Sequence, residues 1–294
     1  MVIVGLDPGN NGREPLDPDY PSGKRLADLM GLSGEDFRRI DRVNLHSSPR
    51  PVGEDPRAAS NLRPILRGRR VLALGERVAR AIGVREDLMR WELSGEFVAA
   101  RVPHPSGRCR RWNDPENAAR AREFLSGSRR PCVHLEGTDG SGKTTLAREL
   151  SAIGGLALVG TEDPPTSWEE CLARVERRVS PGLVCDRSSG LVSELVYGPV
   201  LRGGCLVEEE KLWEVVRAVR ESVVFVYCRP PDEAVSPTFR EGEDPGHVRG
   251  VRERRGQLQA RYDEVMARVS REGCRVVRYD RTRQTPREVM ACAE

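Results

Sequence analysis

Short apolar runs alternate along the first part of this chain with segments whose apolar residues recur every three or four positions. The apolar runs predict buried strands, and the periodic segments predict amphipathic helices. The predicted strands cover residues 1–6, 41–46, 69–75 and 96–104. The predicted helices cover residues 22–31, 55–67, 76–83 and 114–125, the last with an aspartate as its N-cap. Strands that alternate with helices favour a mainly parallel sheet with helices on both faces.

The same alternation starts again after the small and basic segment SGSRRP, residues 126–131. Further strands are predicted at residues 132–137, 156–160, 182–187, 223–229 and 274–280. One helix follows the glycine-rich stretch behind the first of these strands, and others are predicted at 167–179, 189–197, 208–220, 250–271 and 286–293. We therefore predict an α/β protein with two tandem domains, residues 1–127 and 132–294, joined by a linker at 128–131.

The composition limits the class of protein. Hydrophobic residues make up 38% of the chain and charged residues 32%, which is typical of a soluble globular protein. No apolar run approaches the roughly 20 residues that span a bilayer, so we expect no membrane partner. The chain starts without a basic leader or a long apolar signal core, which predicts a cytoplasmic protein. The net charge of +3 is too small to indicate nucleic-acid binding by itself.

The eight cysteines do not form a metal-binding pattern, because none of them pairs in a C-x-x-C motif or clusters with histidine. Several lie inside apolar runs, which is typical of small buried residues in a reducing compartment. We predict no zinc site, no iron–sulfur cluster and no disulfide.

The segment GTDGSGKT, Gly137 to Thr144, matches the phosphate-loop pattern G-x-x-x-x-G-K-[ST] between a predicted strand and a predicted helix. Its glycines let backbone N–H groups surround a phosphate, and the helix N-terminus adds its dipole. Lys143 is expected to reach the β- and γ-phosphates of ATP, and Thr144 to hold Mg²⁺. The predicted cofactor-binding residues are Gly137, Asp139, Gly140, Ser141, Gly142, Lys143, Thr144 and Thr145.

Two segments of the second domain resemble thymidylate kinases and related deoxynucleoside monophosphate kinases, over roughly residues 131–294. They are EGTDGSGKTTLA and CDRSSGLVSELVYGPV. The resemblance implies that Asp186 lies near the metal and the acceptor. It also implies that Arg187 binds acceptor phosphate or transition-state charge, and that Ser193 and Tyr197 lie against the acceptor.

Two further segments bear on catalysis. Residues 240–255, REGEDPGHVRGVRERR, suit a mobile lid that brings positive charge, with Arg249, Arg252 and Arg254 as candidates. The family has an Arg-Glu-Pro-Gly stretch after its second strand, whose arginine helps to hold the acceptor. The corresponding TEDPPTS here lacks that arginine and adds Glu162 and Asp163. These acidic residues favour an acceptor other than plain dTMP.

Four fragments of the first domain stand at predicted strand ends: GLDPG at 5–9, VNLH at 43–46, LALG at 72–75 and PHPSG at 103–107. Together they resemble the uracil-DNA glycosylase superfamily over roughly residues 1–127. The resemblance implies that Asp7 positions the attacking water, that Asn44 reads the Watson–Crick edge of a flipped pyrimidine, and that His104 lies near the base O2. Ser106 and Gly107 would shape the loop that enters the minor groove.

The segment SGRCRRWN, residues 106–113, adds basic and aromatic residues, so DNA is a predicted partner. Arg108, Arg110 and Arg111 are candidates for phosphate contacts, and Trp112 is a candidate for stacking. The family places an aromatic residue soon after its first motif, to stack on the flipped base. The comparable YPSGKRL has Tyr20 and no phenylalanine, which favours base binding over base excision.

A base-flipping fold joined to a thymidylate-kinase-like domain predicts that the phosphate acceptor is a base in DNA. The hydroxymethyl group of 5-hydroxymethyluracil is the chemical candidate, because thymidylate-kinase-like enzymes of some bacterial viruses phosphorylate it in DNA. The expected function is an ATP-dependent kinase in bacteriophage DNA hypermodification, acting in the host cytoplasm. Two alternatives stay open. One is a dTMP or deoxynucleoside monophosphate kinase fused to an active uracil-DNA glycosylase, and the other is a pair of inactive binding modules.

Overall fold

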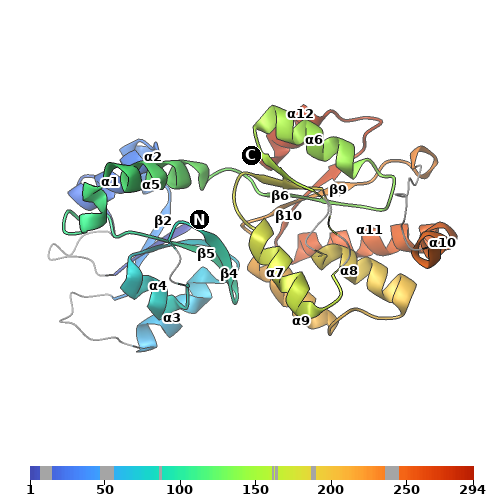
Figure 1. Ribbon diagram of the computed structural model, residues 1–294, viewed down its shortest axis with the longest axis horizontal. Helices are drawn as coiled ribbons and strands as arrows, with labels where there is room; N and C mark the ends of the chain where they lie inside the picture. The colour runs from blue at the N-terminus through green and yellow to red at the C-terminus, as the bar shows by residue number, and fades with distance from the viewer. Residues whose placement is uncertain are drawn as a thin grey trace. The chain divides into compact units, whose positions relative to one another are not determined.

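The computed structural model describes residues 1–6, 15–46, 56–85, 88–160, 162, 165–186, 190–235 and 245–294. These residues form two compact units, Met1–Arg129 and Arg130–Glu294. Each unit contains a five-stranded sheet with helices on both faces (Figure 1). The predicted α/β class with mainly parallel sheets is confirmed.

The first sheet has the strand order β2-β1-β3-β5-β4. Its strands are β1 (Val2–Gly5), β2 (Asp41–Asn44), β3 (Arg70–Leu74), β4 (Trp91–Ser94) and β5 (Phe97–Val102). The first four in this order are parallel, and β4 pairs antiparallel with β5 across a two-residue turn that begins at Gly95. The sequence analysis missed β4, because its residues, Trp-Glu-Leu-Ser, do not form an apolar run.

Helices cover both faces of this sheet. On one face lie α1 (Pro21–Leu29), α2 (Gly34–Arg38) and α5 (Pro115–Gly127), and on the other lie α3 (Pro56–Leu66) and α4 (Glu76–Ile82) (Figure 1). A short 3₁₀ helix covers Arg110–Asn113. The core under α3 and α4 joins alternate strand residues such as Val4 and Ala73 to Leu62 and Val78. Helix α5 runs through the first two residues of SGSRRP, so that segment is partly helical rather than wholly a linker.

The second sheet is parallel throughout, with the order β10-β9-β6-β8-β7. Its strands are β6 (Val133–Glu136), β7 (Ala157–Val159), β8 (Leu183–Cys185), β9 (Val224–Cys228) and β10 (Arg275–Tyr279). The chain builds β7 and β8 on one side of β6, and β9 and β10 on the other. The direction of winding therefore reverses at β6, and ligands of such sheets bind at the carboxyl ends of the strands next to this point.

On one face of the second sheet lie α6 (Lys143–Gly154) and α12 (Pro286–Ala293) (Figure 1). The other face carries α7 (Trp168–Arg178), α8 (Leu191–Tyr197), α9 (Glu209–Ala218) and α11 (Arg255–Arg271). A π-helical turn covers Gly198–Arg202, and a 3₁₀ turn covers Asp232–Ala234.

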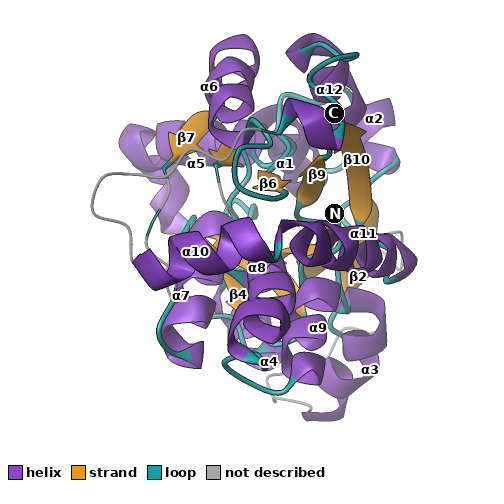
Figure 2. Ribbon diagram, turned by 90° about the vertical axis from the view of Figure 1, so that its right-hand side faces the viewer, coloured by secondary structure: helices purple, strands orange, loops and turns teal. Residues whose placement is uncertain are grey.

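The single helix predicted at residues 250–271 is two helices, α10 (Pro245–Glu253) and α11, which meet at Arg254. Figure 2 shows the two in succession beside α8. Arg254 leaves the helical backbone geometry, and its guanidinium donates to the carbonyl of Val200. That contact ties the junction to the π-helical turn.

Five cysteines are buried, as the sequence predicts for small apolar residues, while Cys292 is exposed. Among the helices of the described residues, none is long and apolar enough to cross a membrane.

Alternation along β6 divides its side chains between two environments. Val133 and Leu135 pack in the core under α6 and α12, so His134 and Glu136 point to the opposite face. The His134 ring is fully buried, lies edge-on to Phe225, and its Nε2 lies 2.9 Å from the carbonyl oxygen of Arg178. Burial lowers the pKa of His134 to about 4.

We expect His134 to make this unit less stable in mild acid. The pKa of His134 in the folded chain lies below its ordinary value of 6.5. At a pH far above 6.5, His134 is therefore unprotonated in both the folded and the unfolded chain. As the pH falls from about 6.5 towards 4, the unfolded chain takes up a proton that the folded chain does not, and each pH unit costs about 1.4 kcal/mol. Urea unfolding at pH 7 and pH 5 measures this loss.

The variant His134→Gln should show a smaller loss of stability between the two pH values than the parent. The matched control is His46→Gln, which removes a partly exposed histidine of the other unit. If the unfolding free energy of His134→Gln depends on pH as that of the parent does, His134 is not the cause of the loss of stability in acid.

Candidate functional site

The glycine-rich loop leaves β6 and turns directly into α6. Gly137, Gly140 and Gly142 have φ values of 142°, 80° and 96°, in a region that side-chain-bearing residues rarely adopt. A Cβ atom added to Gly137 would lie 2.5 Å from the carbonyl oxygen of Cys228, so the loop backbone packs directly on the end of β9. The loop therefore brings main-chain groups, not side chains, to the space in front of the helix.

Lys143 lies in the first turn of α6, and its side chain folds back into this loop. Its Nζ donates to the carbonyl oxygens of Gly137 at 2.7 Å and Thr138 at 2.8 Å. The side chain is buried, so the ammonium is held by the loop rather than by solvent. A cation and a helix N-terminus at one place form an environment that favours a bound anion.

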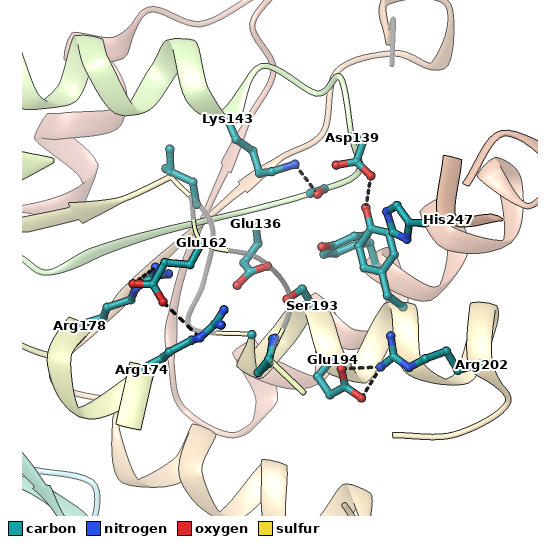
Figure 3. Close-up of a pocket in the computed structure, with 16 residues that line it drawn as sticks. Glu136, Asp139, Lys143, Glu162, Arg174, Arg178, Ser193, Glu194, Arg202 and His247 are labelled. Carbon is teal, nitrogen blue, oxygen red and sulfur yellow. Dashed lines mark hydrogen bonds and ion pairs between the residues drawn. The ribbon is translucent and has the colours of Figure 1, made fainter. Parts of the chain in front are cut away.

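A cleft of about 750 Å³, partly open to solvent, lies below the loop. Its walls come from β6, the glycine loop, α7, α8, α10 and α11 (Figure 3). The polar side chains that line it are Glu136, Asp139, Lys143, Glu162, Arg174, Arg178, Ser193, Glu194, Tyr197, Arg202, His247 and Tyr262.

Two buried carboxylates stand at neighbouring strand ends beside Lys143. Glu136 ends β6 and Asp186 follows β8, and their relative exposures are 1% and 4%. Burial raises the pKa of the Cys228 thiol to about 12, and Lys143, Glu136 and Asp186 all act on this thiol electrostatically. Carboxylate oxygens are the donors that Mg²⁺ prefers. The sequence analysis identified Asp186 and missed Glu136.

An aromatic wall bounds the cleft on the α8 and α10 side. The hydroxyl of Tyr197 donates to Asp139 Oδ2 at 3.0 Å, which connects α8 to the glycine loop. The His247 ring stacks on Tyr197 with ring centres 6.1 Å apart, and Tyr262 meets Tyr197 edge-on. Ser193 and Tyr197, assigned to the acceptor site by resemblance, are therefore both placed in the cleft wall.

A chain of hydrogen bonds connects the glycine loop to α11. Thr138 donates to Gln259, Gln259 donates to the Tyr227 hydroxyl, and Tyr227 donates to Asp263. Burial and the bond to Asp263 raise the pKa of Tyr227, so its hydroxyl stays protonated. This network connects α11 to the glycine loop.

Helix α7 directs three arginines at Glu162. Arg174 Nε and Arg178 Nη2 each lie 3.2 Å from a different oxygen of the Glu162 carboxylate, and Arg177 lies 3.5 Å away. Arg174 and Arg178, four residues apart on one helix face, line the cleft and are almost fully buried. Glu162, which the sequence analysis read as added negative charge, is paired with arginines of α7, so its effect on the choice of acceptor stays a prediction.

The candidate lid arginines lie on α10 and at its junction with α11, and their role stays a prediction. Arg249 and Arg252 are exposed on α10 and are not among the residues that line the cleft. The α10 side chain that lines it is His247, which the sequence analysis did not single out. Thr144 and Thr145 are exposed in the first turn of α6. Arg187, Asp163 and Asp7 lie outside the described residues.

In the first unit, two predicted residues stand at the carboxyl edge of the sheet. The Asn44 side chain lies so close to Gly5 that a Cβ there would be 2.7 Å from its Oδ1. His104 follows β5 and packs on Gly75, where an added Cβ would be 3.3 Å from the His104 Cβ. Asn44 is the last residue of β2 and His104 follows β5. Strands β1 and β3 lie between β2 and β5, so the axes of those two strands are roughly 14 Å apart.

Hydrogen bonds hold the loop after β5 in place. The Ser106 N–H points at His104 Nδ1 at 3.2 Å, so the neutral ring has its proton on Nε2, where it can act as a donor. Trp112 Nε1 donates to the His104 carbonyl at 2.7 Å, which occupies the indole N–H. Arg25 donates to the carbonyls of Pro105 and Ser106.

The predicted phosphate contacts of this loop are accessible. Arg108 and Arg110 are both exposed, as is their neighbour Arg111.

Comparisons with known proteins found no matching family model and no matching curated protein. Solved structures with some likeness include the YorR protein from Bacillus subtilis in complex with phosphorylated GDP. It is 20% identical with a TM-score of 0.38, and the likeness covers 54% of this chain and 91% of that one. The NadR protein in complex with NR is 15% identical with a TM-score of 0.41, over 99% of this chain and 86% of that one.

The NadR protein in complex with NAD and AMP-PNP is 15% identical with a TM-score of 0.38, over the same shares of the two chains. At these values the likeness assigns no function to this chain, so support for one comes from the geometry of the site.

Proposed function

We propose that residues 130–294 bind ATP with Mg²⁺ and transfer its γ-phosphate to a thymine-type acceptor in the cleft. The observation that carries this proposal is the position of Lys143. Its ammonium lies inside a glycine loop at a helix N-terminus, next to the strand at which the sheet reverses its winding. Below it opens a cleft lined by polar side chains from several elements.

The donor groups fit a magnesium nucleotide. Loop N–H groups and the α6 N-terminus bind phosphate oxygens, and Lys143 exchanges its loop carbonyls for the β- and γ-phosphates. The Thr144 hydroxyl and the Asp186 carboxylate are the proposed metal ligands. Magnesium supplies charge neutralisation at the transferring phosphate. The loop's close packing on Cys228 keeps its backbone in place before the nucleotide binds.

The buried Glu136 supports an acceptor that is a hydroxyl. An alcohol must lose its proton when it attacks phosphorus, and a nearby carboxylate can accept that proton. Glu136 projects into the cleft between the Glu162 cluster and Lys143 in Figure 3. A phosphate acceptor is already ionised at neutral pH and needs no such base.

We propose 5-hydroxymethyluracil in DNA as the acceptor that combines these features. The first unit supports a DNA partner, with Asn44 and His104 at one sheet edge and Arg108 and Arg110 exposed on the adjoining loop. Side-chain amides and imidazole N–H groups are suited to reading a flipped pyrimidine. On this proposal the first unit binds the base or the duplex, and the second unit transfers phosphate.

A second candidate is a dTMP or deoxynucleoside monophosphate kinase fused to an active uracil-DNA glycosylase. Arg174 and Arg178 favour it, because the cleft then offers positive charge to a free monophosphate. The Nε2–H tautomer of His104 also favours it, because that proton can stabilise the oxygen of a departing uracil anion.

Replacing Lys143 with alanine should abolish phosphoryl transfer. The loop would keep its shape but lose the cation that stabilises the transferring charge, so we expect the rate to fall by at least about 100-fold. Transfer of label from [γ-³²P]ATP measures the rate, and Lys211→Ala, which removes an exposed lysine from α9, is the control. Equal rates in the parent and Lys143→Ala would exclude a phosphate-loop kinase.

An acceptor panel should identify the substrate class. We expect label on duplex DNA that contains 5-hydroxymethyluracil and none on the same duplex with thymine, which lacks the hydroxyl. Free dTMP is the third arm. Label on dTMP alone would overturn the DNA acceptor and favour the second candidate.

The first unit should bind a uracil-containing duplex without creating abasic sites. Alkaline cleavage of an end-labelled strand measures excision. Abasic sites that disappear in His104→Ala but persist in His46→Ala would contradict this expectation and identify an active glycosylase.

A further inference from the structure

The arginines of α7 form a distinct end of the cleft, and the proposed ATP chemistry makes no use of them. Figure 3 shows Glu162 between Arg174 and Arg178, on the other side of Glu136 from Lys143. Arg174 and Arg178 have relative exposures of 6% and 2% and line the cleft. A buried guanidinium is costly unless an anion and hydrogen-bond acceptors satisfy it.

One carboxylate pairs with both guanidinium groups, as a bound phosphate can. Glu162 Oε1 pairs with Arg178 and Oε2 pairs with Arg174, each at 3.2 Å. Arginine binds the oxygens of carboxylate and of phosphate with the same donor geometry. The Glu162 side chain is 38% exposed, and it approaches from a segment outside the helices and strands. An entering ligand can therefore displace it into solvent.

The charged groups around Arg174 and Arg178 are compatible with a bound phosphate. Arg174, Arg177 and Arg178 bring three positive charges, against which stand Glu162 and Glu170. Hydrogen bonds from Thr166 and Arg174 hold the pKa of Glu170 at about 2, so it stays ionised. Once Glu162 withdraws, Arg174 and Arg178 face the ligand, and Glu170 stays paired with Arg174.

We infer that Arg174 and Arg178 form the subsite for a phosphate of the acceptor, and that Glu162 occupies it as an exchangeable internal anion. This inference rests on the proposed function, because it specifies the acceptor of that reaction as a phosphate-bearing nucleotide. The phosphate belongs either to a free monophosphate or to the backbone of DNA, and both present the same oxygens to the arginines. Glu162 thus sets the affinity: it competes with the ligand for the pair.

Equilibrium binding without ATP tests the subsite independently of catalysis. Isothermal titration of the parent with dTMP and with thymidine compares ligands that differ only in the phosphate. We expect dTMP to bind at least about tenfold more tightly. Equal affinity for the two ligands would overturn the inference, whereas the phosphate-loop proposal is judged separately by the Lys143→Ala rate.

Substitutions in the cluster should move the dTMP affinity in opposite directions. Glu162→Gln removes the competitor and should tighten dTMP binding several-fold without changing thymidine binding, while Glu169→Gln, an exposed neighbour on α7, should change neither. Arg174→Gln should weaken dTMP binding about tenfold. Arg177→Gln is its control, because Arg177 also pairs with Glu162 but does not line the cleft. Weaker dTMP binding in Glu162→Gln would mean a structural ion pair and overturn the inference.

A stability measurement keeps the test valid if Glu162→Gln folds poorly. Inorganic phosphate should raise the melting temperature of Glu162→Gln more than that of the parent, because it replaces the missing anion. An equal rise in both proteins would count against the subsite. Replacing dTMP with a thymidine dinucleotide, whose phosphate is a diester, then assigns the source. If the diester binds and Arg174→Gln weakens that binding, the subsite takes a phosphate of the DNA backbone. If only dTMP binds, the subsite takes the phosphate of a free nucleotide.

Discussion

The close fit of the glycine loop between β6, β9 and α6 is the constraint on which the site depends. Gly137 has no space for a side chain beside Cys228, so the loop backbone packs directly on the end of β9. The Lys143 side chain then folds back, and its buried ammonium donates hydrogen bonds to carbonyl oxygens of the loop. A cation held in this way is preorganised for phosphate, because binding exchanges one set of oxygens for another.

The cleft below this loop has different charged groups at its two ends. The buried carboxylates of Glu136 and Asp186 follow neighbouring strands near Lys143, while Arg174 and Arg178 stand at the α7 end. On the proposed function, this arrangement suits an acceptor with an anionic group at one end and the reacting group at the other. Glu162 stabilises the arginine end, since two buried guanidinium groups without a shared anion would repel each other.

The first unit provides a second carboxyl edge with its own side chains. Asn44 and His104 are fixed by close contact with Gly5 and Gly75, and the Ser106 N–H sets the histidine tautomer. These features suit recognition of a pyrimidine, which is the chemistry that a DNA-directed kinase needs from a partner domain. The proposed function therefore treats the two units as complementary, one for the base and one for the phosphate.

Local pattern in the sequence determined every strand of the described residues except β4, most helices, the two α/β units and the glycine loop, because periodicity and loop motifs depend on neighbouring residues. The resemblance to thymidylate kinases singled out Ser193 and Tyr197, which line the cleft, and Asp186, which follows β8. Only the tertiary structure brought Glu136, Arg174 and His247 into one cleft, since they come from β6, α7 and α10 and no short motif joins them. It also gave Glu162 its partners, which the sequence did not indicate. Three arginines of α7 pair with it in the fold, because helical spacing and chain folding, not sequence proximity, decide which charges meet.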